Sequence, residues 1–492
     1  MDVREARREM GCGRLTTERL LELLEQQQAT IQRLTGEVER LRRRLAQYEP
    51  EVQREPSPAA APAPVEREYS LRAEERRRQR RKRRKKSPGR RPTRLKMADA
   101  ARTEAIYPPG AKRSDCTLLR ERAVWRLEDG RAVLVGYRVF GTPGGAEPRI
   151  AGVTRRCEYG LEILVVLAFL VYVIGISLDK ACGVLRFFCQ LPLTKSQADA
   201  LLRQLARHWE GEFETLCDLI AHAAVVYLDE TGWKIGREGC SLWTFASELA
   251  RVFLFGCRKD ADTLDAMLPP EVFTGVGVSD DAAVYRQRFV RGQKCWAHLL
   301  RKAIRLALWY PRKKKYRRFL DELLAIYYQA KRDAADQRLS SAGRQKRVAA
   351  LEERLCQLCR PQWRKAAPGR PPHERDFANL VNELVQRMLD EELFTFVLEA
   401  GVEPTNNLTE RLQRSPAQDR KAGRTSKTAA GARRRSVIVS VLESLRANLD
   451  SFTLANVVAE ARRWMENGRS LFAQQWQAMM AQISLPLASD TS

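Results

Sequence analysis

Five short apolar segments between residues 221 and 300 limit the possible folds of this chain more than any other feature. Each is rich in Val, Phe or Trp and bounded by Gly, Asp or Ser, as β-strands usually are. In chain order they read AAVVYLDE, CSLWTFAS, RVFLFGCR, FTGVGVSD and QKCWAH. The first three follow closely, as antiparallel strands do, and we expect helices at DADTLDAML and from SDDAAVYRQRF onward. The sequence therefore predicts a mixed α/β sheet.

Three acidic residues stand at the ends of these elements. Asp229 ends the first predicted strand, Asp280 ends the fourth, and Glu410 lies on a later predicted helix. Adjacent central strands would bring the two aspartates together, and a helix packed across the sheet would add the glutamate. Three carboxylates at one point repel each other unless a cation offsets them. Mg²⁺ prefers such oxygen ligands, and a pair of ions roughly 3.5–4 Å apart can support phosphoryl transfer.

Each acidic residue also has an ordinary explanation. Asp229 and Glu230 can open the turn that follows a strand. Asp280 can stand at the start of a helix, where the dipole favours acids. Glu410 follows Asn407 by three residues, as in a capping box. Their joint occurrence in this order of elements, on a strongly basic chain, favours a metal site.

The charge of the chain indicates a polyanionic partner. It carries 87 Lys and Arg against 61 Asp and Glu, a net charge of +26, which favours nucleic acid. Residues 72–96 hold fifteen Lys or Arg and two Glu. A solvated tail is the alternative, but contact with the phosphate backbone is favoured. Two later basic segments, RKAIRLALWYPRKKKYRRF and RKAGRTSKTAAGARRR, share this character. The expected DNA-contacting residues are Arg76, Arg77, Arg80, Arg81, Arg83, Arg84, Lys313, Lys314, Arg420, Lys421 and Arg424.

The N-terminal segment, residues 15–50, has the apolar spacing of a coiled coil. Apolar residues recur at alternating intervals of four and three from Leu20 to Tyr48, with Gln27 as a polar exception. Self-association through this segment is expected, and a long helix packed on the rest of the chain is the alternative. A Pro/Ala-rich linker and the basic segment follow over residues 51–102.

The apolar stretch Ile163–Leu178 raises the question of a membrane span. Its sixteen residues fall short of the roughly 20 that a helix needs to cross a bilayer, so a buried core helix is favoured. The charged N-terminus lacks the apolar segment of a signal peptide. Eleven scattered cysteines, an odd number, favour a reducing, intracellular setting.

The remaining organisation is predicted in outline. Two or three helices over residues 159–220 suggest an accessory, DNA-binding region. Helical periodicity over residues 301–400 includes an apolar face on FANLVNELVQRML. Residues 221–300 and 401–450 would form the core with the acids, and residues 451–492 a helical tail. Residues 103–158 read as an irregular region to which no fold is assigned.

Several motifs together resemble the insertion-sequence 66 (IS66) family of bacterial DDE transposases. They are LDETGWKI, VSDDAAVY followed by QKCWAHLLRKA, and EPTNNLTERLQR with DRKAG beyond it. The long N-terminal helix, the basic segment and the stretch from YGLEILVV to LPLTKSQADALL also fit the layout of that family. The resemblance covers most of the chain.

The resemblance implies an RNase H-like core interrupted by a helical insertion. It implies that Asp229, Asp280 and Glu410 hold Mg²⁺, expected as two ions and replaceable by Mn²⁺. The spacing to Tyr285 favours Asp280 over its neighbour Asp281 as the ligand. The zinc motif of the family is reduced here to Cys116 and Cys157, so zinc is not expected.

Three other features could have a functional role, but core packing is the favoured explanation for each. Cys356 and Cys359 form a CxxC pair, but they lie in a predicted helix without a second pair, which favours core packing over zinc. His298 can position a phosphate or a water, with packing favoured. Trp233 and Trp296 can stack on bases, and core packing is again favoured.

The function expected from this combination is metal-dependent DNA cleavage and strand transfer of an insertion sequence. Double-stranded DNA is the expected partner, with a homo-oligomer formed by the coiled coil and possible helper proteins encoded alongside. A bacterial cytoplasmic, nucleoid-associated location would follow. Two alternatives stay open: an RNase H-like nuclease without strand transfer, and a catalytically inactive DNA-binding protein descended from a transposase.

Overall fold

The computed structural model describes residue 25 and residues 28–40, 91–154, 157–363 and 371–483. The chain divides into two compact units, Met1–Gly89 and Arg90–Ser492. In the first unit, residues 28–40 are helical, and their apolar side chains Ile31, Leu34 and Val38 are exposed. Most of the predicted coiled coil, and Arg76, Arg77, Arg80, Arg81, Arg83 and Arg84, lie outside the described residues.

The second unit begins with a small sheet, which corrects the irregular region expected over residues 103–158. Helix α4 precedes three strands in the order β1-β3-β2, with β1 parallel and β2 antiparallel to β3. A tight turn at Asp129 and Gly130, both with positive φ (47° and 79°), joins the two long strands. Asp-Gly is a hairpin signal, but arginines interrupt the apolar alternation on both sides of it, so the sequence pattern does not predict these strands. The elements are α4 Thr93–Ala98, β1 Arg102–Ile106, the 3₁₀ turn Arg113–Asp115, β2 Thr117–Glu128 and β3 Arg131–Gly141.

A helical layer follows, with four α-helices where two or three were expected. The first half of the apolar stretch is a buried helix as predicted, but the π-helical segment after it is only partly buried and Ile174 is exposed. The helix stops before Gly175, whose φ of 75° favours a residue without a Cβ. Thr194 and Gln197 form a capping box at the start of α7. Within the described residues, no helix is long and apolar enough to cross a membrane. The elements are α5 Leu161–Ala168, the π-turn Phe169–Val173, α6 Leu178–Cys189, α7 Lys195–His208 and α8 Glu210–Ala221.

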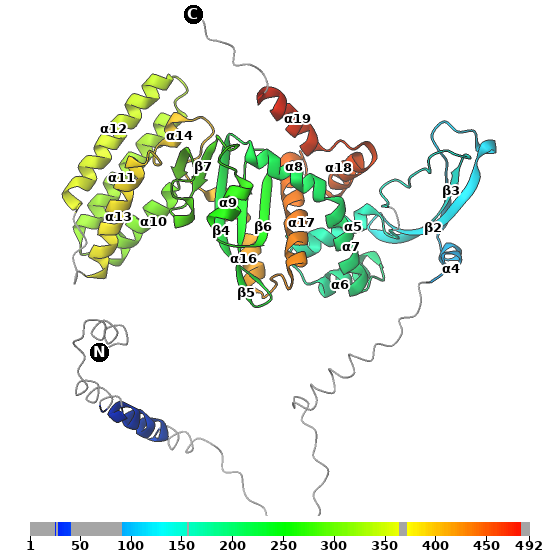
Figure 1. The fold of residues 1–492 in the computed structure, drawn as a ribbon, viewed down its shortest axis with the longest axis horizontal. Coiled ribbons are helices and arrows are strands. Elements are labelled where there is room, and N and C mark those ends of the chain that lie inside the picture. The colour runs from blue at the N-terminus through cyan, green and yellow to red at the C-terminus, as the bar shows by residue number, and fades with distance from the viewer. Residues whose placement is uncertain (1–24, 26–27, 41–90, 155–156, 364–370, 484–492) are drawn as a thin grey trace, which may run out of the picture. The chain divides into compact units, whose positions relative to one another are not determined.

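The predicted mixed sheet is confirmed. Its order is β6-β5-β4-β7-β8, in which β4, β5 and β6 are antiparallel while β7 and β8 run parallel to β4 (Figure 1). The helix expected before the fifth strand is instead a short 3₁₀ turn, Ala283–Tyr285. The Asp280 carboxylate accepts a hydrogen bond from the Ala282 N–H (2.9 Å), and Gln287 has a φ of 53°, so the loop turns too tightly for a helix. The elements are β4 Val225–Ile235, β5 Glu238–Ala246, β6 Arg251–Cys257, α9 Ala261–Met267, β7 Val276–Ser279 and β8 Arg291–Lys294.

Helix α17, Ala429–Asn448, covers the edge strand β6. Its buried serines recur every four residues and face the strand. Ser436, Ser440 and Ser444 accept hydrogen bonds of 2.8–2.9 Å from the backbone N–H groups of Phe255, Phe253 and Arg251. Serine hydroxyls thus satisfy edge-strand donors that a further strand would otherwise pair.

Helices occupy most of the chain between β8 and α17. The apolar face predicted on Phe377–Met388 is buried, together with residues of α11 and α12. Cys359 is buried, and the Cys356 sulfur lies 3.8 Å from that of Met388. The elements are α10 Trp296–Trp309, α11 Lys314–Ala335, α12 Ser341–Cys359, the 3₁₀ turn Arg360–Gln362, α13 Pro372–Leu389, α14 Thr395–Leu398, α15 Asn407–Leu412 and α16 Arg414–Lys421. Beyond α17 lie α18 Leu454–Asn467 and α19 Leu471–Ile483.

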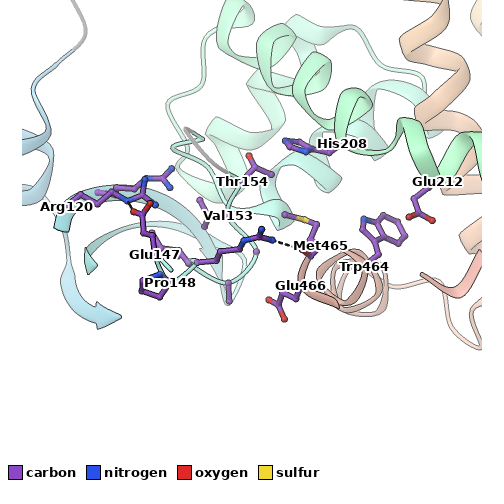
Figure 2. Close-up of a pocket in the computed structure, with 15 residues that line it drawn as sticks. Arg120, Glu147, Pro148, Val153, Thr154, His208, Glu212, Trp464, Met465 and Glu466 are labelled. Carbon is purple, nitrogen blue, oxygen red and sulfur yellow. Dashed lines mark hydrogen bonds and ion pairs between the residues drawn. The ribbon is translucent and has the colours of Figure 1, made fainter. Parts of the chain in front are cut away.

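A cavity of about 660 Å³ lies where the loop before α5 meets α7, α8 and α18 (Figure 2). Its walls mix arginines with acids, and Arg149 donates a hydrogen bond to the Met465 carbonyl (3.2 Å) across it. Asp229, Asp280 and Glu410 are not among its lining residues. The cavity is therefore separate from the three acids.

Ser440→Ala tests the contact between α17 and β6. Removing the hydroxyl leaves the buried Phe253 N–H without its acceptor, so we expect the free energy of unfolding to fall by about 1–3 kcal/mol. Urea denaturation followed by tryptophan fluorescence measures the change. Ser341→Ala, at an exposed position of α12, is the control. Equal stability of the two variants would contradict this role of the serines.

Candidate active site

Asp229 and Asp280 are placed together by the pairing of β4 with β7. These strands are parallel, and Tyr227 stands opposite Val278. Two residues further along each strand, the same register reaches Asp229 and Asp280. Residues separated by two along a strand lie on one face of the sheet. The carboxylates predicted to meet therefore leave neighbouring strands at the same position.

Glu410 comes near Asp229 from α15, because the residues before that helix are fixed to the sheet. Its charge contributes to the raised pKa of Asp229, but among the described residues Asp229, Asp280 and Glu410 do not form a group whose ligand atoms all lie within 4.8 Å of one another. The buried Asn406 side chain donates a hydrogen bond to the carbonyl of Leu228, the residue before Asp229. The Asn406 N–H donates to the Cys295 sulfur (3.2 Å), and the Thr409 hydroxyl donates to the Asn406 side-chain oxygen (2.6 Å). The start of α15 is thus held against the middle of β4, next to Asp229.

The electrostatics of Asp229 reflect this crowding. Burial, followed by the negative charges of Asp280, Glu230 and Glu410, raises the pKa of Asp229 from 3.8 to about 7. Like charges held this close destabilise the protein unless they are neutralised. The donor set consists of carboxylate oxygens, which suits a hard divalent cation such as Mg²⁺. These side chains therefore fit a metal site.

Glu230, next to Asp229, is engaged elsewhere. Its buried carboxylate accepts a hydrogen bond from the Tyr285 hydroxyl and forms an ion pair with Lys259. Burial and the Glu230 charge raise the pKa of Tyr285 well above its usual value, so the phenol stays protonated and donates. Glu230 thus has both a hydrogen-bond donor and a cation.

Asp281, next to Asp280, points to the helices instead of the sheet. It forms an ion pair with the buried Arg387 of α13 (2.8 Å). Arg387 also pairs with Asp390 (2.7 Å) and Glu392 (3.0 Å). Asp281 thus belongs to a charged cluster that joins the loop after β7 to α13, whereas Asp280 interacts with Asp229.

Helix α10 and the residue before it, Cys295, add three groups near Glu410: Cys295, His298 and Arg301. Ligand-type atoms of Cys295, His298 and Glu410 lie within 4.8 Å of one another. Burial raises the pKa of Cys295, and a protonated thiol is a poor metal ligand. Arg301 is the closest cation: its Nη2 lies 3.0 Å from both carboxylate oxygens of Glu410. The sequence placed Arg301 in a basic segment, but no pattern paired it with Glu410.

The other predicted site residues are distributed as follows. Lys313, Lys314 and Lys421 are exposed. Arg420 donates to the Thr231 hydroxyl (2.9 Å) and the Gly232 carbonyl, so it is held against β4 just beyond Asp229. Arg424 lies 3.9 Å from Asp419.

The two tryptophans considered for base stacking are buried in the structure. Trp233 is 1 % exposed and Trp296 is 0 % exposed. Their ring N–H groups donate to the Ser426 hydroxyl (3.3 Å) and the Leu393 carbonyl (2.7 Å). Both tryptophans pack in the core, as predicted, and are not exposed for base stacking.

Comparison with known protein families confirms the resemblance to IS66 transposases. A model of the transposase IS66 family matches residues 156–434, more than half of the chain. The chain belongs to this family. A search of curated proteins finds no match. The matched part of this IS66-family transposase contains Asp229, Asp280 and Glu410, and it begins after the small N-terminal sheet.

Asp229→Asn tests the electrostatic crowding. Because folding raises the pKa of Asp229, the folded state holds a proton that the unfolded chain releases between about pH 4 and 7, so stability falls as the pH rises through this range. Without metal at pH 8, we expect the variant to be more stable than wild type by on the order of 2–4 kcal/mol. The difference should narrow as the pH approaches 4.

Thermal melts with and without Mg²⁺ measure this effect. Mg²⁺ should raise the melting temperature of wild type at pH 8 and leave that of Asp229→Asn nearly unchanged, because a ligand stabilises only the state that binds it. Equal stabilisation of both proteins would contradict the placement of a cation at Asp229.

Arg387→Met tests the charged cluster around Asp281. The substitution leaves Asp281 and the buried Glu392 without this counter-charge, so we expect a loss of about 3–5 kcal/mol of stability. Chemical denaturation measures it. Arg286→Met, at an exposed position of the same loop, should cost little. A similar small loss for both variants would show that Arg387 does not hold the loop in place.

Proposed function

We propose that this transposase catalyses metal-dependent cleavage and strand transfer of DNA, with Asp229, Asp280 and Glu410 as the metal ligands. The convergence of these three carboxylates from β4, the end of β7 and α15 carries the proposal. The raised pKa of Asp229 supports it, because the repulsion among these groups is what a bound cation would offset.

The topology of the sheet supports an RNase H-like core. Three antiparallel strands are followed by two that run parallel to the first, in the order β6-β5-β4-β7-β8. Asp229 lies within β4 and Asp280 directly follows β7, and these are adjacent central strands. The helical segment between β8 and α15 takes the place of the insertion expected in this family. The same arrangement suits a nuclease, so the joining reaction needs its own test.

The proposed chemistry has two steps and no covalent link between protein and DNA. Water attacks a phosphodiester at the end of the element and frees a 3′-OH. That hydroxyl then attacks a phosphodiester of the target, and a target 3′-OH leaves. When bound, two Mg²⁺ ions, or Mn²⁺ in their place, would supply charge neutralisation for the attacking and leaving oxygens. Asp229, Asp280 and Glu410 would fix their positions.

Exposed basic residues near the start of α11 and the end of α16 are the proposed contacts to the DNA backbone. Lys313, Lys314 and Lys421 are free to reach solvent, and such contacts position DNA without reading its sequence. Arg420 is held against β4, so its proposed contact would lie close to Asp229. The basic residues of the first unit, from Arg76 to Arg84, are proposed to add affinity.

Self-association through the N-terminal helix fits the same task. Ile31, Leu34 and Val38 keep a spacing of three and four and are 61 %, 51 % and 49 % exposed. A coiled coil between two copies would bury them, and two subunits would hold the two ends of an element together. Helper proteins encoded alongside are a further expectation from the family.

The decisive experiment is Mg²⁺-dependent joining of a pre-cleaved element end to a plasmid. We expect Asp280→Asn and Glu410→Gln to reduce joining at least about 100-fold, because each removes a ligand that positions the charge-stabilising ions. Glu403→Gln, an exposed glutamate seven residues before Glu410, is the matched control and should join like wild type. Gel analysis quantifies the products.

Each other outcome has a distinct meaning. Cleavage of uncut element ends without joining would replace the proposal by the nuclease alternative. DNA binding without either reaction, and without any effect of the substitutions, would support the catalytically inactive DNA-binding protein.

A further inference from the structure

The Arg301–Glu410 ion pair engages one of the proposed metal ligands. Arg301 lies in the second turn of α10, and a single guanidinium nitrogen is 3.0 Å from each oxygen of the Glu410 carboxylate. The Arg301 side chain is 53 % exposed and that of Glu410 is 27 % exposed. The glutamate is thus mostly covered, while the arginine remains open to solvent.

This pair is incompatible with full use of Glu410 as a metal ligand. A divalent cation beside Asp229 and Asp280 would compete with Arg301 for the same carboxylate oxygens and would repel the guanidinium. Arginine does not lose its proton in proteins, so it cannot resolve the conflict by becoming neutral. The side chain must move away from Glu410, and its exposure allows it to do so.

The chemistry of arginine indicates what would receive it. A planar guanidinium matches the oxygens of a phosphodiester, which it binds through two parallel hydrogen bonds. Nearby cations of the same helix are used differently: Lys302 pairs with Glu383 (2.5 Å), and Arg305 lies over the Trp309 ring (5.3 Å). Arg301 is the cation placed to exchange a carboxylate of the site for a phosphate of DNA.

We propose that Arg301 is a positioning residue that responds to DNA. Without DNA it holds the Glu410 carboxylate; when a DNA end binds, its guanidinium transfers to a phosphodiester and leaves Glu410 free for the metal. This inference rests on the function proposed above and adds to it a coupling between DNA binding and completion of the metal site. Coupling of this kind is reciprocal, so each ligand strengthens the binding of the other.

Mn²⁺ binding by the full-length protein, with and without a short DNA duplex, tests the inference. Electron paramagnetic resonance of free Mn²⁺ gives the affinity without relying on activity. We expect DNA to raise the Mn²⁺ affinity of wild type about fivefold or more. Arg301→Gln should bind Mn²⁺ about as tightly without DNA as wild type does with it, and DNA should add little.

The variant should also lose part of its DNA binding. Without Mn²⁺, the salt dependence of Arg301→Gln should become shallower by the equivalent of about one phosphate contact. Arg291→Gln is the matched control: Arg291 is 45 % exposed and forms an ion pair with Glu399 (2.6 Å). It should bind Mn²⁺ like wild type in both conditions. Circular dichroism verifies that each variant folds.

Glu410→Gln separates failure of this inference from failure of the proposed function. If Glu410→Gln weakens Mn²⁺ binding but Arg301→Gln does not strengthen it without DNA, the role of Arg301 is wrong and the metal site stands. If Glu410→Gln and Asp280→Asn both bind Mn²⁺ like wild type, the proposed metal site itself is wrong. Without DNA, adding Arg301→Gln to Glu410→Gln should not change the Mn²⁺ affinity further, because the arginine affects metal binding through that carboxylate.

Discussion

The hydrogen bond from Asn406 to the Leu228 carbonyl joins two parts of the chain that are 178 residues apart. It is buried within β4, where an unpaired carbonyl or amide would be costly. The bond fixes the start of α15 next to Asp229, and α15 carries Glu410. The position of the third carboxylate therefore depends on a neutral amide outside the site. The long helical segment leaves the sheet from the edge strand β8, and α15, which follows it, contacts the inner strands β4 and β5.

Acidic residues that are adjacent in the sequence differ here in the partners with which they interact. Glu230 has Lys259 and Tyr285, and Asp281 has Arg387, so the charge of each is compensated within the protein. Asp229 has no such partner among the residues that the structure describes: burial and the charges of Asp280, Glu230 and Glu410 raise its pKa. Crowded carboxylates of this kind are typical of functional sites, where stability is given up for chemistry. In each pair of adjacent acids, one residue stabilises the fold through its own partners (Glu230, Asp281). The other residue (Asp229, Asp280) belongs to the candidate site.

The sequence predicted the parts of the site that depend on local pattern. The strands around Asp229 and Asp280 are predicted from apolar runs that lead into acidic residues, and Glu410 is predicted from its place on a later helix, with the family resemblance in support. The expectation that Asp229 ends its strand is wrong, because β4 continues to Ile235 and pairs with β5 over this stretch. The hairpin Thr117–Gly141 was not predicted, because its many arginines hide the alternation that marks a strand. The pairing of Arg301 with Glu410 was beyond any sequence pattern, since it joins residues 109 positions apart whose contact depends on how α10 and α15 pack.

The helical segment between β8 and α15 contacts the site at two points, and this gives it more than a structural role. Through Arg387 of α13 it holds the loop that carries Asp280, and through Arg301 of α10 it holds Glu410. Both contacts are ion pairs to acids at or beside the proposed metal ligands, but they differ in burial: the Arg387 side chain is 7 % exposed and that of Arg301 is 53 % exposed. A buried ion pair has no competitor from solvent, whereas an exposed one can be exchanged for a phosphate. In the proposed mechanism, the same segment would keep one proposed ligand fixed and make the other depend on DNA.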